Sequence, residues 1–199
     1  MANWRLRVHF FIKLLGVVLA GVILGLGGTL LMLERGVSFG AVKAGPWTAS
    51  PHNGSLDVDP YARAMFAYTG ELPLGAAEGI GFTAQKDSMG APLNAHCDYI
   101  VSGHTPQARY WTMTLLSPEG LPVANAARRY GFTSAEILRA PGGNFEIALS
   151  RHARPGNWLP IGDASKFMLV LRLYDPDLNI ATLSLDEASL PALIRKNCR

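Results

Sequence analysis

The hydrophobic pattern of the chain is uninterrupted near the N-terminus and alternating farther on. From Leu14 to Leu33 the sequence runs for twenty residues without a charged side chain. As a helix that rises about 1.5 Å per residue, this run spans about 30 Å, the thickness of the hydrocarbon layer of a membrane. The pattern therefore predicts one transmembrane helix over residues 10–33, in contact with membrane lipid.

Charges on either side of this segment predict its orientation. Glu34 and Arg35 follow the apolar run, whereas three basic residues precede or enter it: Arg5, Arg7 and Lys13. Basic residues beside a membrane helix favour the cytoplasmic side. We therefore expect residues 1–9 in the cytoplasm, and a single-pass protein of the inner (cytoplasmic) membrane whose C-terminal domain lies in the periplasm.

Two questions about the apolar segment remain open. A cleaved signal peptide is one alternative, with cleavage after Ala44, but the apolar core of a signal peptide is usually only about 7–15 residues long. An uncleaved signal anchor is therefore the stronger interpretation. Gly21 and Gly25 have the small-residue spacing that lets two membrane helices pack closely, although glycine is common in membrane helices in general.

Beyond the membrane segment the hydrophobic period changes to two. Trp111, Met113 and Leu115 alternate with more polar neighbours, which is the pattern of a strand with one buried face. The same reasoning predicts strands over residues 79–85, 98–103, 110–115, 145–150 and 167–174.

Turn residues between these strands favour an all-β arrangement. All 13 prolines follow residue 45, and Pro-Gly or Pro-x-Gly sequences separate several of the predicted strands. This spacing is typical of a sandwich or jelly roll. We therefore expect residues 56–199 to form a mainly β domain, an antiparallel jelly-roll-like β-sandwich with short flanking helices, preceded by the transmembrane helix.

The flanking helices and the linker follow from local signals. Asp59 before Pro60 is a favourable helix start, and Gly70 is a favourable helix end. A second short helix is expected over residues 187–196, close to the C-terminus. Residues 34–55 contain several glycines and prolines without a sustained hydrophobic period, so they are expected to be a linker.

The charge balance argues against nucleic acid as a partner. The chain has 18 basic and 15 acidic residues, but three of the basic residues belong to the N-terminal flank that ends at Lys13. The expected domain is therefore close to neutral. Binding of nucleic acid requires clustered lysine and arginine side chains that neutralise phosphates, and the domain has only short basic pairs.

The two cysteines, Cys97 and Cys198, are candidates for a disulfide. An oxidising compartment outside the membrane allows them to pair. A bridge that closes a loop of about 100 residues stabilises a fold by about 4–5 kcal/mol in the chain-entropy description. Two separate thiols, or a bond between two molecules, are the alternatives.

Four neighbouring residues have side chains that commonly bind metals: His96, Cys97, Asp98 and His104. Consecutive strand residues point to opposite faces, and the spacing fits no recognised ligand pattern. We therefore expect neither a metal site nor a cofactor.

Candidate catalytic and ligand-binding residues are few. Glu78, Asp98 and Glu146 carry carboxylates that hydrolytic chemistry would need, but they are dispersed along the chain, so the catalytic residues remain unknown. Trp111 falls on the apolar face of its strand and is expected in the core. Asn157 and Trp158 lie between a glycine and a proline, which makes them the predicted ligand-binding residues.

Six consecutive motifs carry a resemblance to a known family: residues 59–64, 70–74, 108–115, 129–134, 155–160 and 171–176. In order and extent they resemble the domain of unknown function 1214 family from about residue 57 onward. The chain is similar to small proteobacterial members that carry one N-terminal membrane segment. The resemblance implies a jelly-roll-like β-sandwich and supplies no catalytic residues.

The resemblance also implies a partner. Larger members of the family join this domain to a second β-sandwich, the domain of unknown function 1254. A separately encoded protein of that type is therefore an expected partner.

Together these observations predict a membrane-anchored cell-envelope protein that acts as a non-enzymatic binding or assembly module. The alternative is a periplasmic hydrolase or lyase that acts on envelope saccharides or small molecules. An enzyme is expected to gather Glu78, Asp98, Glu146 or His104 in one concave site, whereas a binding module is expected to have a grooved, polar and aromatic surface.

Overall fold

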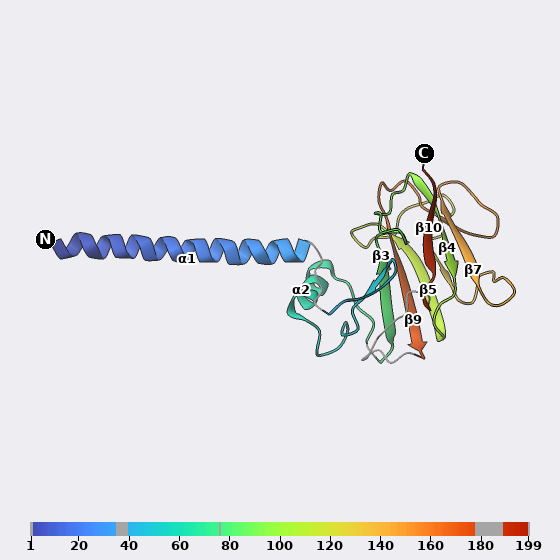
Figure 1. Cartoon of the computed structure of the whole chain (residues 1–199), viewed down its shortest axis with the longest axis horizontal. Helices are drawn as coiled ribbons and strands as arrows, with labels where there is room; N and C mark the ends of the chain where they lie inside the picture. The colour runs from blue at the N-terminus through green and yellow to red at the C-terminus, as the bar shows by residue number, and fades with distance from the viewer. Residues whose placement is uncertain (1, 35–39, 76, 178–188, 199) are drawn as a thin grey trace. The chain divides into compact units, whose positions relative to one another are not determined.

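The fold was analysed in a computed structural model that describes residues 2–34, 40–75, 77–177 and 189–198 (Figure 1). The chain forms two compact units. One unit comprises Met1–Ser38 and Asp59–Glu71, and the other comprises Phe39–Val58 and Leu72–Arg199.

The first unit contains a long apolar helix, α1 (Ala2–Glu34). Within it, Val8–Met32 is long and apolar enough to cross a membrane, and none of this stretch is buried inside the protein. The helix is compatible with a single-pass anchor or with a signal sequence. It includes the segment that the sequence predicts to lie in lipid.

Helix α2 (Pro60–Thr69) confirms the helix predicted from its two end residues. The side chain of Asp59 accepts hydrogen bonds from the backbone N–H groups of Tyr61 and Ala62, both at 3.0 Å. Gly70 ends the helix with a φ of 70°, and its N–H donates to the carbonyl of Phe66 at 2.9 Å. Glycine is the residue most often found in this left-handed conformation after the last turn of a helix.

The second unit is mainly β and consists of two sheets. The larger sheet has six strands in the order β1-β2-β3-β9-β5-β6, and all its pairs are antiparallel. Its strands are β1 (Val42–Ala44), β2 (Trp47–Ala49), β3 (Gly79–Ala84), β5 (Ala108–Leu116), β6 (Gly131–Thr133) and β9 (Met168–Pro176).

The smaller sheet has four strands in the order β10-β4-β7-β8. Its strands are β4 (Cys97–Gly103), β7 (Phe145–Ser150), β8 (Asn157–Pro160) and β10 (Ala192–Cys198). The pairs β10–β4 and β4–β7 are antiparallel, whereas β7 and β8 are parallel. The sheet is therefore mixed, in contrast to the purely antiparallel arrangement that was expected, and the jelly-roll-like strand order stays a prediction.

One hydrophobic core lies between the two sheets. In Figure 1, β3 and β9 of the larger sheet lie toward the left of the β-domain, and β4 and β7 of the smaller sheet lie toward the right. Trp111 of the larger sheet contacts Phe145 of the smaller one, with ring centroids 5.2 Å apart. The indole N–H of Trp47, which is fully buried, donates to the carbonyl of Pro191 at 2.7 Å. Trp111 is 2% exposed, as expected for a core residue.

Two predictions about local structure are wrong. Within the expected linker 34–55, β1 and β2 extend the larger sheet, because Trp47 and Ala49 bury their side chains in the core and pair with β3. The expected helix over 187–196 falls partly outside the described residues, and from Ala192 onward the chain is strand β10. Pairing with β4 satisfies the backbone of this segment in place of helical hydrogen bonds.

Strand β10 lies at the edge of the smaller sheet, and part of its free edge is covered. The backbone N–H of Ser88 donates to the carbonyl of Leu193, and the hydroxyl of Ser88 accepts from the N–H of Leu193, both at 2.9 Å. Beside them, Nε of Arg195 lies 3.0 Å from Oδ2 of the buried Asp87. This contact is an ion pair in which the N–H is not aligned for a hydrogen bond.

Candidate functional site

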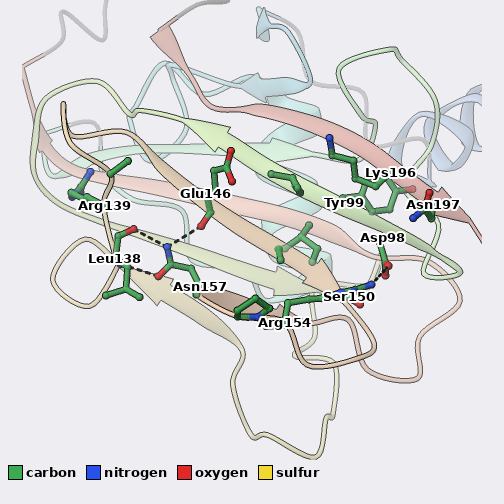
Figure 2. A pocket seen from close by; sticks show the side chains of 16 residues that line it. Asp98, Tyr99, Leu138, Arg139, Glu146, Ser150, Arg154, Asn157, Lys196 and Asn197 are labelled. Atoms are coloured by element: carbon green, nitrogen blue, oxygen red, sulfur yellow. Dashed lines mark hydrogen bonds and ion pairs between the residues drawn. The ribbon is translucent and has the colours of Figure 1, made fainter.

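An open groove of about 690 Å³ lies against the smaller sheet (Figure 2). Its floor includes Ile100 of β4 and Ala148 of β7, two half-buried residues. They alternate with core residues such as Val101 and Ile147, which are fully buried. Since side chains alternate along a strand, the groove lies on the outer face of this sheet.

Three segments form the walls of the groove: residues 138–140, residues 154–157, and Lys196 with Asn197. The first belongs to the connection before β7, the second to the connection between β7 and β8 together with the first residue of β8, and the third to the end of β10. The groove therefore depends on the placement of loops and of one edge strand, as well as on the sheet itself.

Asn157, one of the two predicted ligand-binding residues, fixes one wall to the sheet. Its Oδ1 accepts from the N–H of Leu138, and its Nδ2 donates to the carbonyls of Leu138 and Glu146, all at 2.8 Å. The dashed lines in Figure 2 mark these contacts. Asn157 is 8% exposed, and both hydrogens of its amide are used within the protein. It therefore positions the wall, with no amide hydrogen left for a ligand.

Trp158, the other predicted residue, is half-buried beside the groove and does not line it. Its indole N–H donates to the carbonyl of Ser150 at 3.0 Å, and its own carbonyl accepts from Nη1 of Arg129 at 3.0 Å. In the parallel pair of β7 and β8, Trp158 lies opposite Ala148. The tryptophan supports the edge strand of the groove.

Charged side chains gather along the groove. Asp98 and Arg154 form an ion pair at 2.7 Å. Nη1 of Arg139 donates to the carbonyl of Gly143 at 3.0 Å, and its guanidinium lies over the rings of Trp111 and Phe145, 5.8 Å and 5.7 Å from their centroids. These contacts hold three of the groove's charged groups in defined positions.

Two further charged groups line the groove and are exposed, Glu146 and Lys196. Among the described residues, neither side chain has a hydrogen-bond or ion-pair partner. The groove therefore combines a largely apolar floor with one free anion and one free cation, an arrangement suited to a ligand that is itself partly apolar and partly charged.

The residues that sequence reasoning named as candidate acids and bases are divided between locations. Asp98 and Glu146 line the groove, whereas Glu78 and His104 do not. Glu146 is opposite Ser102 on β4, four residues from Asp98 along that strand. At about 3.3 Å per residue, the backbone positions of the two carboxylates are about 13 Å apart. Figure 2 shows them toward different ends of the groove.

The histidine and cysteine cluster is also divided. Cys97 forms a disulfide with Cys198, so its sulfur is not a free ligand. Asp98 is paired with Arg154, as described above. In the part of the chain that the structure describes, no three histidine, cysteine, aspartate or glutamate side chains are placed to hold one metal ion.

Sequence reasoning missed the cationic residues of the groove, Arg139, Arg154 and Lys196. They lie in a turn before β7, in the connection between β7 and β8, and in a segment expected to be helical. Only the sheet pairing brings these three segments together. Pro155 and Gly156 indicate a turn, so the sequence alone could have placed Arg154 just before a strand. It could not have shown which segment forms the opposite wall of the groove.

The chain is similar to solved structures at low sequence identity, and the first of the two below shares its fold. The crystal structure of the VPA0106 protein from Vibrio parahaemolyticus matches with a TM-score of 0.59 and 17% identity, over 93% of this chain and 46% of that chain. An uncharacterized protein from Burkholderia cenocepacia matches with a TM-score of 0.38 and 16% identity, over 63% of this chain and 31% of that chain. The chain thus spans less than half the length of either protein.

Sequence comparison identifies the family directly. No curated protein matches the chain. The sequence profile of the family described as "Protein of unknown function (DUF1214)" matches residues 78–178, just over half of the 199 residues. The match covers strands β3 to β9, including the floor of the groove and two of its three walls. The chain therefore belongs to the DUF1214 family.

Proposed function

We propose that the protein is a membrane-anchored binding module of the cell envelope, and that the groove on the smaller sheet is its binding site. The observation that carries this proposal is the groove itself, which is concave, has a largely apolar floor and presents Glu146 and Lys196 without partners within the described residues. A few polar groups converging on an apolar surface are typical of binding sites.

The anchor is the first part of the proposal. Val8–Met32 supports a single span, and the basic flank supports a cytoplasmic N-terminus with the β-domain in the periplasm. Cleavage after Ala44 has less support, because Ala44 is 4% exposed and is the last residue of β1, so the cut would separate β1 from the sheet. The resemblance to small proteobacterial members with one N-terminal membrane segment supports this plan. Alkaline phosphatase fused after residue 199 tests the orientation, and an inactive fusion beside an active cytoplasmic reporter would contradict it.

The second part is the partner. A separately encoded protein with a domain of unknown function 1254 is the proposed occupant, with one of its segments lying in the groove. Anchoring both proteins in one membrane raises their effective concentration, so a modest interface suffices. Pairing of two copies through Gly21 and Gly25 is a further prediction, and the single substitutions Gly21→Leu and Gly25→Leu should weaken such pairing.

Co-expression tests the partner and the site together. The full chain is captured from membranes solubilised in mild detergent, after co-expression with a DUF1254 protein from the same genome. We expect the partner to be retained by the unaltered chain and lost with Ala148→Trp, which fills the groove floor. Thr83→Trp is the matched control, since Thr83 is a half-buried residue on the larger sheet. Recovery of a monomer or homo-oligomer alone, or full retention by Ala148→Trp, contradicts the proposal.

A hydrolase or lyase has less support. Paired carboxylates in glycoside hydrolases are about 5–9.5 Å apart. Asp98 is already paired with Arg154, and Figure 2 shows Asp98 and Glu146 toward different ends of the groove and not as a facing pair. This arrangement favours binding over acid–base chemistry.

A further inference from the structure

The last strand of the domain pairs regularly with β4 only as far as Arg195. The register runs from Ala192 opposite Ser102 to Arg195 opposite Tyr99. It is then interrupted, and the next pair is Cys198 opposite Cys97. Lys196 and Asn197 lie in this irregularity, and both line the groove. They are called the β10 wall below.

Noncovalent contacts secure β10 on the inner side of this interruption. Leu193 exchanges two hydrogen bonds with Ser88. Arg195 donates through Nη2 to the carbonyl of Pro92 at 2.7 Å, pairs with Asp87, and lies over the ring of Tyr99 at 5.6 Å from the centroid. The strand up to Arg195 therefore has its own attachment to the sandwich.

On the outer side of the interruption, the chain returns to β4 at the Cys97–Cys198 disulfide. The side chains of Lys196 and Asn197 are exposed, and within the described residues they have no hydrogen-bond partner. The position of the β10 wall thus depends on Arg195 at one end and on the disulfide at the other. Asp98, whose carboxylate pairs with Arg154 in the groove, directly follows Cys97.

The two cysteine residues differ in exposure. Cys97 is 3% exposed, whereas Cys198 is an exposed residue. A thiolate of an external dithiol can attack Sγ of Cys198, so that the bond between Cys97 and Cys198 breaks and the sulfur of Cys97 leaves and takes up a proton. The second thiol of the dithiol then attacks the mixed disulfide. The products are two protein thiols and one oxidised dithiol, a transfer of two electrons.

We propose that the Cys97–Cys198 disulfide controls the position of the β10 wall and thereby the shape of the groove. Reduction of this bond by a dithiol, such as a thiol–disulfide oxidoreductase of the envelope, releases the β10 wall and leaves the rest of the sandwich folded. The opening itself is a property of the fold. Its effect on binding rests on the proposed function of the groove.

Hydrogen exchange of the full chain in detergent micelles tests the opening. Amide exchange is compared before and after complete reduction with dithiothreitol, and in a Cys97→Ser/Cys198→Ser variant. We expect exchange at residues 196–198 to rise by about tenfold or more, because local opening exposes these amides. Loss of the bridge also lowers the stability of the whole fold, so exchange over β7 is expected to rise as well. Leu193 and the β7 residues 145–150 should nevertheless stay protected, with exchange at least about tenfold slower than at residues 196–198 in the reduced protein.

Two results overturn the proposal. Unchanged exchange at residues 196–198 after reduction means that other contacts hold the β10 wall. Exchange over β7 that becomes as fast as at residues 196–198 means that the disulfide supports the whole fold and does not act on the groove alone. Capture of the DUF1254 partner with and without dithiothreitol is a separate measurement. If the oxidised chain does not capture the partner, the proposed function is contradicted. The exchange measurement still decides whether reduction opens the β10 wall.

Discussion

Replacing Asn157 with alanine tests the idea that this residue builds the groove and does not serve its ligand. The substitution removes three hydrogen bonds and leaves the N–H and carbonyl of Leu138 and the carbonyl of Glu146 without their amide partner. A net intramolecular hydrogen bond contributes about 0.5–1.5 kcal/mol, so the loss of three part-buried bonds adds up to a few kcal/mol. We therefore expect Asn157→Ala to lower the free energy of unfolding by about 2–4 kcal/mol.

Urea unfolding of the full chain in detergent measures this change. Fluorescence reports on Trp47 and Trp111, which are 0% and 2% exposed. With an m-value of about 2 kcal/mol/M, the expected loss lowers the urea midpoint by about 1–2 M. Asn197→Ala is the matched control, because Asn197 also lines the groove but is exposed and makes no hydrogen bond within the described residues.

The control should shift the free energy of unfolding by less than about 0.5 kcal/mol, as expected for a surface substitution. Equal effects of the two substitutions would refute the reasoning, since they would mean that the three bonds of Asn157 add nothing to the fold. An unaltered midpoint in Asn157→Ala would refute it in the same way.

Three further substitutions test separate features of the domain. Asp87→Ala should lower the free energy of unfolding by about 2–4 kcal/mol in urea melts, because Asp87 is 3% exposed, accepts two backbone N–H groups and pairs with an arginine of β10. The hydrogen bond from Ser117 lowers the pKa of Glu119 below its ordinary 4.5. The ionised carboxylate of Glu119 therefore stabilises the fold above pH 4.5, and this contribution is lost as the pH falls through the lowered pKa. Ser117→Ala should raise the pKa of Glu119 in an NMR titration. Gly131→Ala should lower the thermal midpoint, because a Cβ there would meet the carbonyl of Met113 at 2.4 Å, whereas Gly81→Ala, which has open space, should leave it nearly unchanged.

Long alternating segments were predictable from the sequence, and short ones were not. Strands β5, β7 and β9 each have six or more residues, enough for a two-residue period to be recognised. β1, β2 and β6 have three residues each, too few to distinguish a strand from a turn. These short strands form because neighbouring strands provide backbone hydrogen-bond partners. The burial of Trp47 shows that packing in the core, and not the local sequence pattern, determines that its segment is a strand.

The end of the chain misled sequence reasoning for a related reason. Leu190, Leu193 and Ile194 have helical spacing, so the pattern favours a helix. In the fold, Leu193 is fully buried and Leu190 is 5% exposed, while Ile194 is 41% exposed on the opposite side of the strand. Pairing with β4 and the link to Cys97 override the local preference. The two cysteines were the only signal that this segment returns to the sheet.

The candidate site was predictable only in part. Asn157 and Trp158 were predicted as ligand-binding residues from the glycine and proline around them; the structure places both in β8, where Asn157 lines the groove and Trp158 lies beside it. The groove forms here because β8 pairs in parallel with β7 after a connection of only six residues, 151–156. Parallel neighbours are usually joined by a dozen or more residues, so a sequence pattern favours a hairpin at such a short spacing. The convergence of Arg139, Arg154 and Lys196 follows from that pairing.

The cover that Ser88 provides over Leu193 bears on how copies of the domain behave when they are crowded. An open strand edge presents backbone donors and acceptors in register, and such an edge can recruit an identical strand from a neighbouring molecule and grow into a fibre. Ser88 occupies the amide and the carbonyl of Leu193 at the middle of β10. At high local concentration, this contact protects the domain from polymerisation through the edge of β10. Charged side chains that repel an approaching copy are not needed at this position.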